Sequence, residues 1–177
     1  MTSLQIVIRE AKIDDLETLH KIELECFGHE AFPKSWFEYF LKTPRFLNLV
    51  ALVKGEIAGF IIGSIERYGN KTHGHIYSLD VSLGYRRRGV AYRLLNKAEE
   101  ILIESGAEAC HLEVRTDNIP ALRLYKKRGY TITETLKNYY RTGVNGFRLS
   151  KNLSDQQARH PLRSRLANNT QSKRLYG

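Results

Sequence analysis

One stretch, from Asp80 to Ala98, most constrains how this chain of 177 residues can fold. An apolar strand runs into Arg86-Arg87-Arg88-Gly89-Val90-Ala91, and a helix with a regular apolar period follows from Tyr92 to Ser105. A helix whose first turn is built from glycine and small residues exposes backbone N–H groups at the positive end of its dipole. The sequence therefore predicts a phosphate-binding loop between a strand and a helix. The other interpretation of the three arginines is a solvated surface or an RNA-binding patch.

Length and composition exclude several classes of protein. The chain has no long linker before residue 150, so we expect one domain, residues 1–153, with a substantial core. No apolar run approaches the roughly 18 residues of a membrane span, and the first residues alternate like a strand rather than a signal peptide. Cys26 and Cys110 lack metal-ligand spacing, which predicts reduced thiols and no metal site. We expect a soluble, cytoplasmic protein without a membrane partner.

The formal net charge of +9 is unevenly placed, because residues 154–177 form a basic, polar tail without apolar periodicity. Two interpretations of this tail stay open. It is either a flexible solvated segment or a contact site for an acidic partner such as a ribosome, RNA or an auxiliary subunit. Its charged residues are Arg159, Arg163, Arg165, Lys173 and Arg174, against Asp155 alone.

Periodicity and turn residues predict seven strands and four helices in the order β-α-α-β-β-β-α-β-α-β-β. The helices start near Asp14, at Pro33, after Gly89 and at Pro120, and Tyr68 to Gly74 is interpreted as a polar turn. Hairpin strands interspersed with crossover helices indicate an α/β fold whose mixed sheet has helices on both faces. The predicted strands are Leu4–Arg9, Leu47–Val53, Ile57–Arg67, His75–Val81, Ala109–Arg115, Tyr130–Tyr139 and Gly146–Leu153.

Three motifs in order identify a family resemblance, since the dinucleotide and P-loop patterns both fail at their diagnostic positions. Arg86-x-x-Gly89-x-Ala91, the turn at Asn118 and Leu124-Tyr125-x-x-x-Gly129-Tyr130 resemble the GCN5-related N-acetyltransferase (GNAT) superfamily, which binds acetyl-CoA. The likeness covers roughly residues 5–150. It implies a central, mostly antiparallel sheet that splays apart between its fourth and fifth strands.

Within that superfamily the chain looks like two groups, the ribosomal-protein alanine acetyltransferases and the archaeal and eukaryotic catalytic subunits of N-terminal acetyltransferases. The segments that carry this likeness are His75-Ile76-Tyr77-Ser78-Leu79-Asp80-Val81, Leu112-Glu113-Val114-Arg115 and Asn138-Tyr139-Tyr140. The resemblance implies transfer of an acetyl group to the free α-amine of a protein or peptide by direct attack in a ternary complex.

The resemblance also implies where acetyl-CoA binds. Strand backbone at Leu79 and Val81 would hold the pantetheine, with the Val81 N–H polarising the acetyl carbonyl. Asp80 departs from the small residue common at its position, and strand alternation allows its carboxylate to point to the opposite face. Asn118 would pair with the pantetheine, or serve only its own turn. The complete set of expected contacts is Leu79, Asp80, Val81, Arg86, Arg87, Arg88, Gly89, Val90, Ala91, Tyr92, Asn118 and Tyr125.

For catalysis, an α-amine needs little help to lose its proton, because its pKa lies near about 7.7 to 8.0. Alternation along the strand places Glu113 on the cleft side, and the resemblance makes Glu113 the base, alone, with His75 or through water. The alternative for Glu113 is a salt bridge to Arg115 or a nearby lysine. Tyr125 would protonate the departing thiolate, its alternative being one more packed aromatic ring.

The substrate groove is implied by the resemblance to lie between Phe32-Pro33 and Tyr139-Tyr140. A tight groove favours the α-amine of a small first residue over a lysine side chain. Two other functions stay open at this point. One is acetylation of a lysine or a small amine, and the other is a ribosome- or RNA-binding module with a vestigial CoA site. The sequence permits a monomer or a dimer.

Overall fold

Seven strands form one sheet in the order β1-β2-β3-β4-β5-β7-β6. All neighbouring strands are antiparallel except β4 and β5, which run parallel. The computed structural model describes residues 4–141 and 143–157. The predicted mixed, mostly antiparallel sheet is therefore confirmed. The strands are β1 (Ile6–Glu10), β2 (Phe46–Val53), β3 (Glu56–Tyr68), β4 (Lys71–Val81), β5 (Ala109–Arg115), β6 (Thr131–Leu136) and β7 (Gly146–Asn152).

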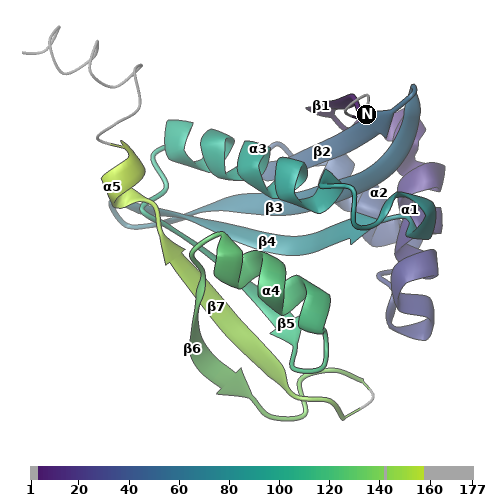
Figure 1. Ribbon diagram of the computed structural model, residues 1–177. Coiled ribbons are helices and arrows are strands. Elements are labelled where there is room, and N and C mark those ends of the chain that lie inside the picture. The colour runs from purple at the N-terminus through teal and green to yellow at the C-terminus, as the bar shows by residue number, and fades with distance from the viewer. Residues whose placement is uncertain (1–3, 142, 158–177) are drawn as a thin grey trace, which may run out of the picture.

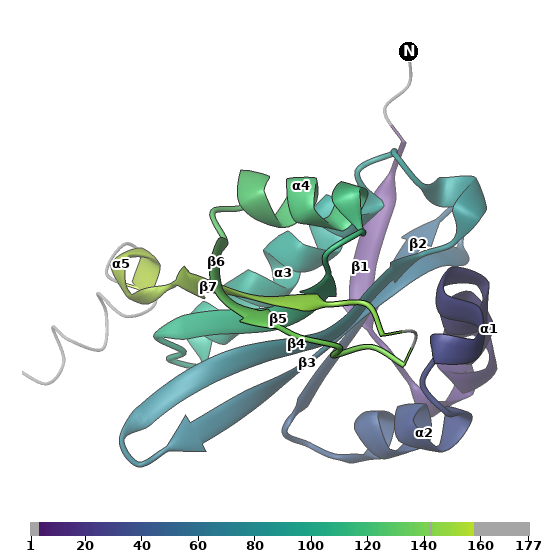
Figure 2. The same cartoon turned by 90° about the horizontal axis from the view of Figure 1, so that it is seen from below.

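Helices cover both faces of the sheet, as predicted. Helices α1 and α2 lie against one face, and α3 and α4 lie against the other (Figures 1 and 2). A short helix, α5, follows the last strand. The helices are α1 (Leu16–Phe27), α2 (Lys34–Lys42), α3 (Val90–Glu104), α4 (Ile119–Lys127) and α5 (Ser154–Gln157), with single 3-10 turns η1 (Ile13–Asp15), η2 (Gly28–Glu30) and η3 (Leu83–Tyr85).

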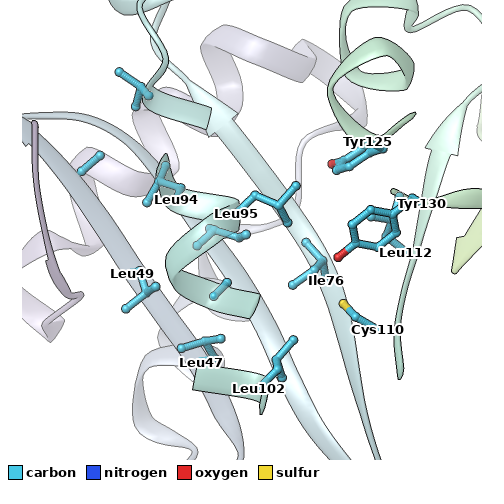
Figure 3. Close-up of a cluster of buried hydrophobic side chains, with 14 of the residues drawn as sticks. Leu47, Leu49, Ile76, Leu94, Leu95, Leu102, Cys110, Leu112, Tyr125 and Tyr130 are labelled. Carbon is cyan, nitrogen blue, oxygen red and sulfur yellow. The ribbon is translucent and has the colours of Figure 1, made fainter. Parts of the chain in front are cut away.

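Each face of the sheet has its own hydrophobic core. Under α3, Leu94, Leu95 and Leu102 pack on the sheet beside Ile76 and Leu112, as Figure 3 shows. On the other face the core is aromatic, with the rings of Phe37, Phe40 and Phe60 in edge-to-face contact. The aromatic side chains of α2 belong only partly to this core, because Trp36 is 50% exposed and stacks on Phe32 at its outer end.

The parallel strands β4 and β5 pair over only four residues each, His73–Ile76 with Ala109–Leu112. Beyond this point they diverge (Figure 1), which confirms the predicted splay. The register between β3 and β4 shifts at the same place, because Ile62 pairs with Ser78 and the next residue of β3 pairs with Ile76. Tyr77 is thus an extra residue in β4, and this bulge marks the start of the divergent segment.

Several element boundaries differ from the prediction. The hairpin turn between β3 and β4 is short, and β4 begins at Lys71, not at His75, because Arg67 pairs with Thr72 in a polar, partly exposed ladder. The polar side chains of residues 71–73 are the reason that the sequence predicted a turn where the structure has a strand. Strand β6 ends at Leu136, three residues before the predicted end. The first four residues of the expected tail form α5, and residues 158–177 lie outside the described part of the chain.

Both cysteines are free thiols, Cys110 buried and Cys26 half-buried, as predicted. Within residues 4–141 and 143–157, every helix is too short or too polar to cross a membrane.

Candidate active site

The loop before α3 has the backbone shape expected for binding phosphate. Arg87 and Gly89 both adopt left-handed backbone conformations, with φ of 61° and 83°. These turns direct successive N–H groups to one side of the chain, a concavity that suits anions. A Cβ on Gly89 would meet nothing within 4 Å, so the space above the loop is open. Val90 is buried and anchors the start of α3 to the core, and helix α3 thus begins two residues before Tyr92.

The three arginines beside this loop behave differently. Arg86 turns back toward β4, where its Nε donates to the carbonyl of Val81 at 3.1 Å and its NH2 group lies 3.3 Å from Cys26 Sγ. Arg87 and Arg88 are exposed at the loop itself. The positive charge of the loop therefore comes mainly from those two side chains and from the helix end.

The divergent part of β4 offers unpaired backbone on the side facing β5. The N–H of Ser82 bonds to Ala58 of β3 at 3.0 Å, and successive N–H groups of a strand alternate between its two edges. The N–H of Val81 therefore points into the space between β4 and β5. The side chains of Leu79 and Val81 belong to the core under α3, whereas Asp80 pairs with Phe60 and faces α1. The expectation that the Asp80 carboxylate points to the opposite face is confirmed.

Glu113 lies on the cleft side of β5, since the burial of this strand alternates with Cys110, Leu112 and Val114 inward. Its Oε2 is 2.7 Å from Nε2 of His75, and its Oε1 accepts from Nε of Arg148 at 3.0 Å. Burial opposes ionisation of Glu113, but the hydrogen bonds from His75 and Arg148 outweigh burial and lower its pKa to about 2.

The sequence left open a salt bridge from Glu113 to Arg115 or a nearby lysine, and the structure pairs Glu113 with His75 and Arg148. Arg115 instead pairs with Asp117 and Glu30, because it lies at the end of β5 where the strand meets the α1–α2 side. The partner of Glu113 is Arg148 of β7, which is directly opposite Glu113 in the ladder.

His75 sits between two carboxylates. Its Nδ1 is 3.6 Å from Oε1 of Glu66, on the side away from Glu113, and its ring packs on Tyr77 and His111 at 4.3 Å. Burial lowers the pKa of His111. A cavity of about 560 Å³ opens beside this group. It is lined by Glu66, Tyr68, His75, His111, Glu113, Thr133, Arg148 and Ser150.

Three residues of this cavity have ligand atoms within 4.8 Å of one another, namely Glu66, His75 and His111. Such a set can bind a transition metal. The Nε2 of His75 already contacts Glu113, which leaves only its Nδ1, on the Glu66 side, for a metal ion. The hydrogen-bonded pair of His75 and Glu113 is an arrangement that can transfer a proton.

Tyr125 belongs to α4 and Asn118 is the residue directly before this helix, which lies beside the space between β4 and β5. Tyr125 is 7% exposed, at the edge of the core beside Tyr130 and Leu112 (Figure 3), and burial raises the pKa of its phenol. Asn118 caps α4, because its Oδ1 accepts from the N–H of Ala121 at 3.3 Å. The local turn role that the sequence left open for Asn118 is thus present.

The two expected walls of the substrate groove approach each other. Phe32 and Pro33 precede α2, while Tyr139 and Tyr140 follow β6 and contact each other edge to face at 5.1 Å. Arg115 connects the two walls, since its guanidinium pairs with Glu30 after α1 and lies over the Tyr140 ring at 5.6 Å.

Sequence reasoning missed two residues of this site. Arg148 and Glu66 contact the predicted site residues Glu113 and His75 from other elements. A signal existed for Arg148, because pairing β5 with β7 in register places it opposite Glu113. For Glu66, the contact depends on how the β3–β4 hairpin bends, and the sequence pattern carries no such signal.

Comparison with known proteins places this arrangement in a family. The model of the acetyltransferase (GNAT) family matches residues 15–130. The N-terminal acetyltransferase A complex catalytic subunit NAA10 of Arabidopsis thaliana is 31% identical over 154 residues, which span 86% of this chain and 80% of that protein.

Solved structures agree with this result. Ard1 from Thermoplasma volcanium superposes with a TM-score of 0.75 at 30% identity, over 83% of this chain and 97% of the other. The ribosomal-protein-S18-alanine N-acetyltransferase from Escherichia coli shares the fold, with a TM-score of 0.74 at 22% identity over 85% and 95% of the two chains. The chain belongs to the acetyltransferase (GNAT) family.

Proposed function

We propose that this protein transfers the acetyl group of acetyl-CoA to the free N-terminal α-amine of proteins and peptides. The observation that carries the proposal is the opening between β4 and β5, which has Glu113 and His75 on one side and Tyr125 near the other. The phosphate-binding loop before α3 lies at the end of the same opening. The relatives named as N-terminal acetyltransferases support the choice of an α-amine.

The proposed cosubstrate fits the residues present. Open space above Gly89 and the outward N–H groups of the loop suit the pyrophosphate, with Arg87 and Arg88 adding charge. The unpaired edge of β4 at Leu79 and Val81 suits the amides of the pantetheine. Val90, Ala91 and Tyr92 supply the first turn of the helix that faces the phosphates, and Asn118 lies across the opening, directly before α4.

In the reaction, the amine nitrogen forms a bond to the acetyl carbon, and the bond from that carbon to sulfur breaks. The Val81 N–H stabilises the negative charge that develops on the carbonyl oxygen. His75 takes the proton of the amine through a chain of water molecules, because it lies six residues before Val81 along β4, and Glu113 stabilises the imidazolium that results. Tyr125 donates its proton to the leaving thiolate.

The first residue of the substrate lies between Phe32-Pro33 and Tyr139-Tyr140. The Arg115 link between these walls limits the width of the groove, which favours small first residues such as Ala or Ser. The cavity of about 560 Å³ beside Glu113 is the place for side chains that follow.

A cytoplasmic location and a partner subunit are part of the proposal. The relative from Arabidopsis thaliana is named a catalytic subunit of a complex, which supports an auxiliary subunit here. The basic residues beyond Gln157 supply charge for contact with a ribosome. The likeness to ribosomal-protein alanine acetyltransferases adds a ribosomal protein as a possible substrate class.

The test measures free thiol released from acetyl-CoA with peptides that differ only at position one, as Ala, Ser, Met or Glu. An N-blocked peptide with one lysine is the matched control. We expect turnover on the free α-amines, fastest for Ala or Ser, and none on the blocked peptide. Turnover on the lysine peptide alone would identify a lysine acetyltransferase. No turnover on any peptide, although acetyl-CoA binds, would indicate a binding module.

A further inference from the structure

Two carboxyl groups outside the proposed proton relay are buried together between β4 and α1. Glu23 and Asp80 are each only 2% exposed, and Ser78 lies between them at 6%. Oγ of Ser78 is 3.2 Å from Oε2 of Glu23 and 3.2 Å from Oδ2 of Asp80. The second oxygen of Glu23, Oε1, accepts the backbone N–H of Phe32 at 3.0 Å.

The number of hydrogens in this cluster requires an additional proton. The hydroxyl of Ser78 carries one hydrogen, so it donates to only one of its two carboxyl neighbours. The other contact is a hydrogen bond only if that carboxyl group is protonated and donates to the serine oxygen. Glu23 already receives the N–H of Phe32, so its charge is stabilised better than that of Asp80, and the proton belongs on Asp80.

We propose that Asp80 holds a proton at neutral pH and, through Ser78 and Glu23, fixes the backbone of Phe32 at the groove wall. Asp80, Ser78 and Glu23 are then positioning residues. This inference rests on the proposed function, because Phe32 matters only if it borders the substrate. The bulge at Tyr77 is what turns Ser78 and Asp80 together toward α1.

The surroundings determine how the cluster responds to pH. The charged or titratable groups close enough to affect the ionisation of Asp80 are Glu23 and Cys26 of α1, Arg86, and Tyr125 of α4 on the other face of the sheet. Burial raises the pKa of Asp80 well above its ordinary range, and the charge of Glu23 raises it further, while Ser78 and Arg86 oppose this. As pH rises and Asp80 loses its proton, two negative charges share one buried site. The hold on Phe32 then weakens.

The first test needs no substrate. Wild type is compared with Asp80→Asn, whose amide donates to Ser78 without titrating. The control is Glu17→Gln, which changes an exposed carboxylate on α1, the helix that carries Glu23. We expect the infrared band of a protonated carboxyl at pH 7 in wild type and Glu17→Gln, absent in Asp80→Asn. Amide exchange at Phe32 rises more steeply with pH in wild type than in Asp80→Asn. If the band is absent in wild type, or if amide exchange at Phe32 depends on pH equally in wild type and Asp80→Asn, then Asp80 does not hold the proton.

The second test measures KM for one Ala-initiated peptide at pH 7 and pH 9. Titration of the peptide amine affects both enzymes equally and cancels in the comparison. We expect the ratio of KM at pH 9 to KM at pH 7 to be about threefold to tenfold larger in wild type than in Asp80→Asn. Equal ratios, with the band and the exchange as expected, would overturn the positioning role. An enzyme inactive on every peptide would contradict the proposed function while the first test still decides the state of Asp80.

Discussion

The hydrogen-bond partners of Glu113, a predicted base, hold it in the ionised form. Two donors, His75 and Arg148, keep its pKa at about 2, so at neutral pH it has little tendency to accept a proton and keep it. A carboxylate fixed in this way is well suited to orient an imidazole and to stabilise its protonated form. In the proposed mechanism the proton transfer therefore centres on His75, which has Glu113 and Glu66 on its two sides.

The depressed pKa of Glu113 makes a prediction about stability. A carboxyl group whose folded pKa lies below its unfolded value of about 4.3 stabilises the fold above that pH, and the contribution is lost as pH falls toward 2. We expect Glu113→Gln to lower the free energy of unfolding at pH 7 by about 1–3 kcal/mol and to match wild type near pH 2. Urea unfolding at pH 7, 4 and 2 measures the difference. Glu38→Gln, at an exposed pair with Lys42, is the control. A difference that stays constant with pH would contradict the ionised, paired state of Glu113.

Tyr125 makes a prediction about chemistry. Replacement by Phe keeps the ring in the core beside Tyr130 but removes the proton offered to the thiolate. We expect kcat to fall by about 100-fold or more while the Kd for acetyl-CoA stays within about threefold of wild type. Steady-state kinetics and calorimetric binding of acetyl-CoA provide the two numbers. Tyr130→Phe is the matched control. Wild-type kcat in Tyr125→Phe would remove the general acid and leave the residue a packing role.

At the scale of elements, the sequence predicted those features that depend on neighbouring residues of one strand or one helix. Alternation in β5 correctly separated Glu113 from Cys110, Leu112 and Val114, because the period of a strand is fixed by its backbone. The glycine and small residues at the start of α3 correctly predicted a strand, a loop and a helix in that order. The Glu113–Arg148 pair and the start of β4 at Lys71 were missed, since each depends on the register between strands and polar ladders resemble turns. Site contacts between elements were thus beyond a single sequence.

The loop before α3 is tested by Gly89→Ala. An alanine at φ of +83° costs about 1 kcal/mol, and its Cβ enters the space expected to hold pyrophosphate. We expect KM for acetyl-CoA to rise by about tenfold or more with little change in KM for the peptide. Gly55→Ala in the β2–β3 turn is a matched control, because its φ is +84° and its surroundings are equally open. Equal effects of both substitutions on KM for acetyl-CoA would assign the result to backbone strain alone.

The link between the groove walls is tested by Arg115→Ala. Removing the guanidinium separates Glu30 after α1 from Tyr140 after β6, so both walls gain freedom. We expect KM for an Ala-initiated peptide to rise by about fivefold to tenfold, and discrimination against a Met-initiated peptide to fall. The control is Arg45→Ala, whose exposed guanidinium lies over Phe46 away from the groove. Unchanged preference between the two peptides would show that Arg115 does not set the groove width.

At the scale of the whole molecule, the last described helix, α5, extends a little beyond the predicted domain end at residue 153. Leu153 is fully buried, and Ser154 begins α5 with its Oγ donating to the carbonyl of Glu108. A cut after residue 153 would remove this closing contact with Glu108, the residue before β5. A cut after Gln157 keeps every described element and removes only the remaining basic segment.

The two cuts separate catalysis from association. We expect residues 1–157 to keep kcat/KM for an Ala-initiated peptide within about twofold of the full chain, because the described site lies entirely within them. Co-sedimentation with ribosomes should fall for residues 1–157 and should weaken with rising salt for the full chain, since five basic side chains are lost. A chain cut after residue 153 tests the role of α5, and we expect its Tm to be lower than that of residues 1–157. Loss of peptide turnover in residues 1–157 would place part of the active site in the segment after Gln157, and sedimentation equal to the full chain would move any ribosome contact to the folded domain.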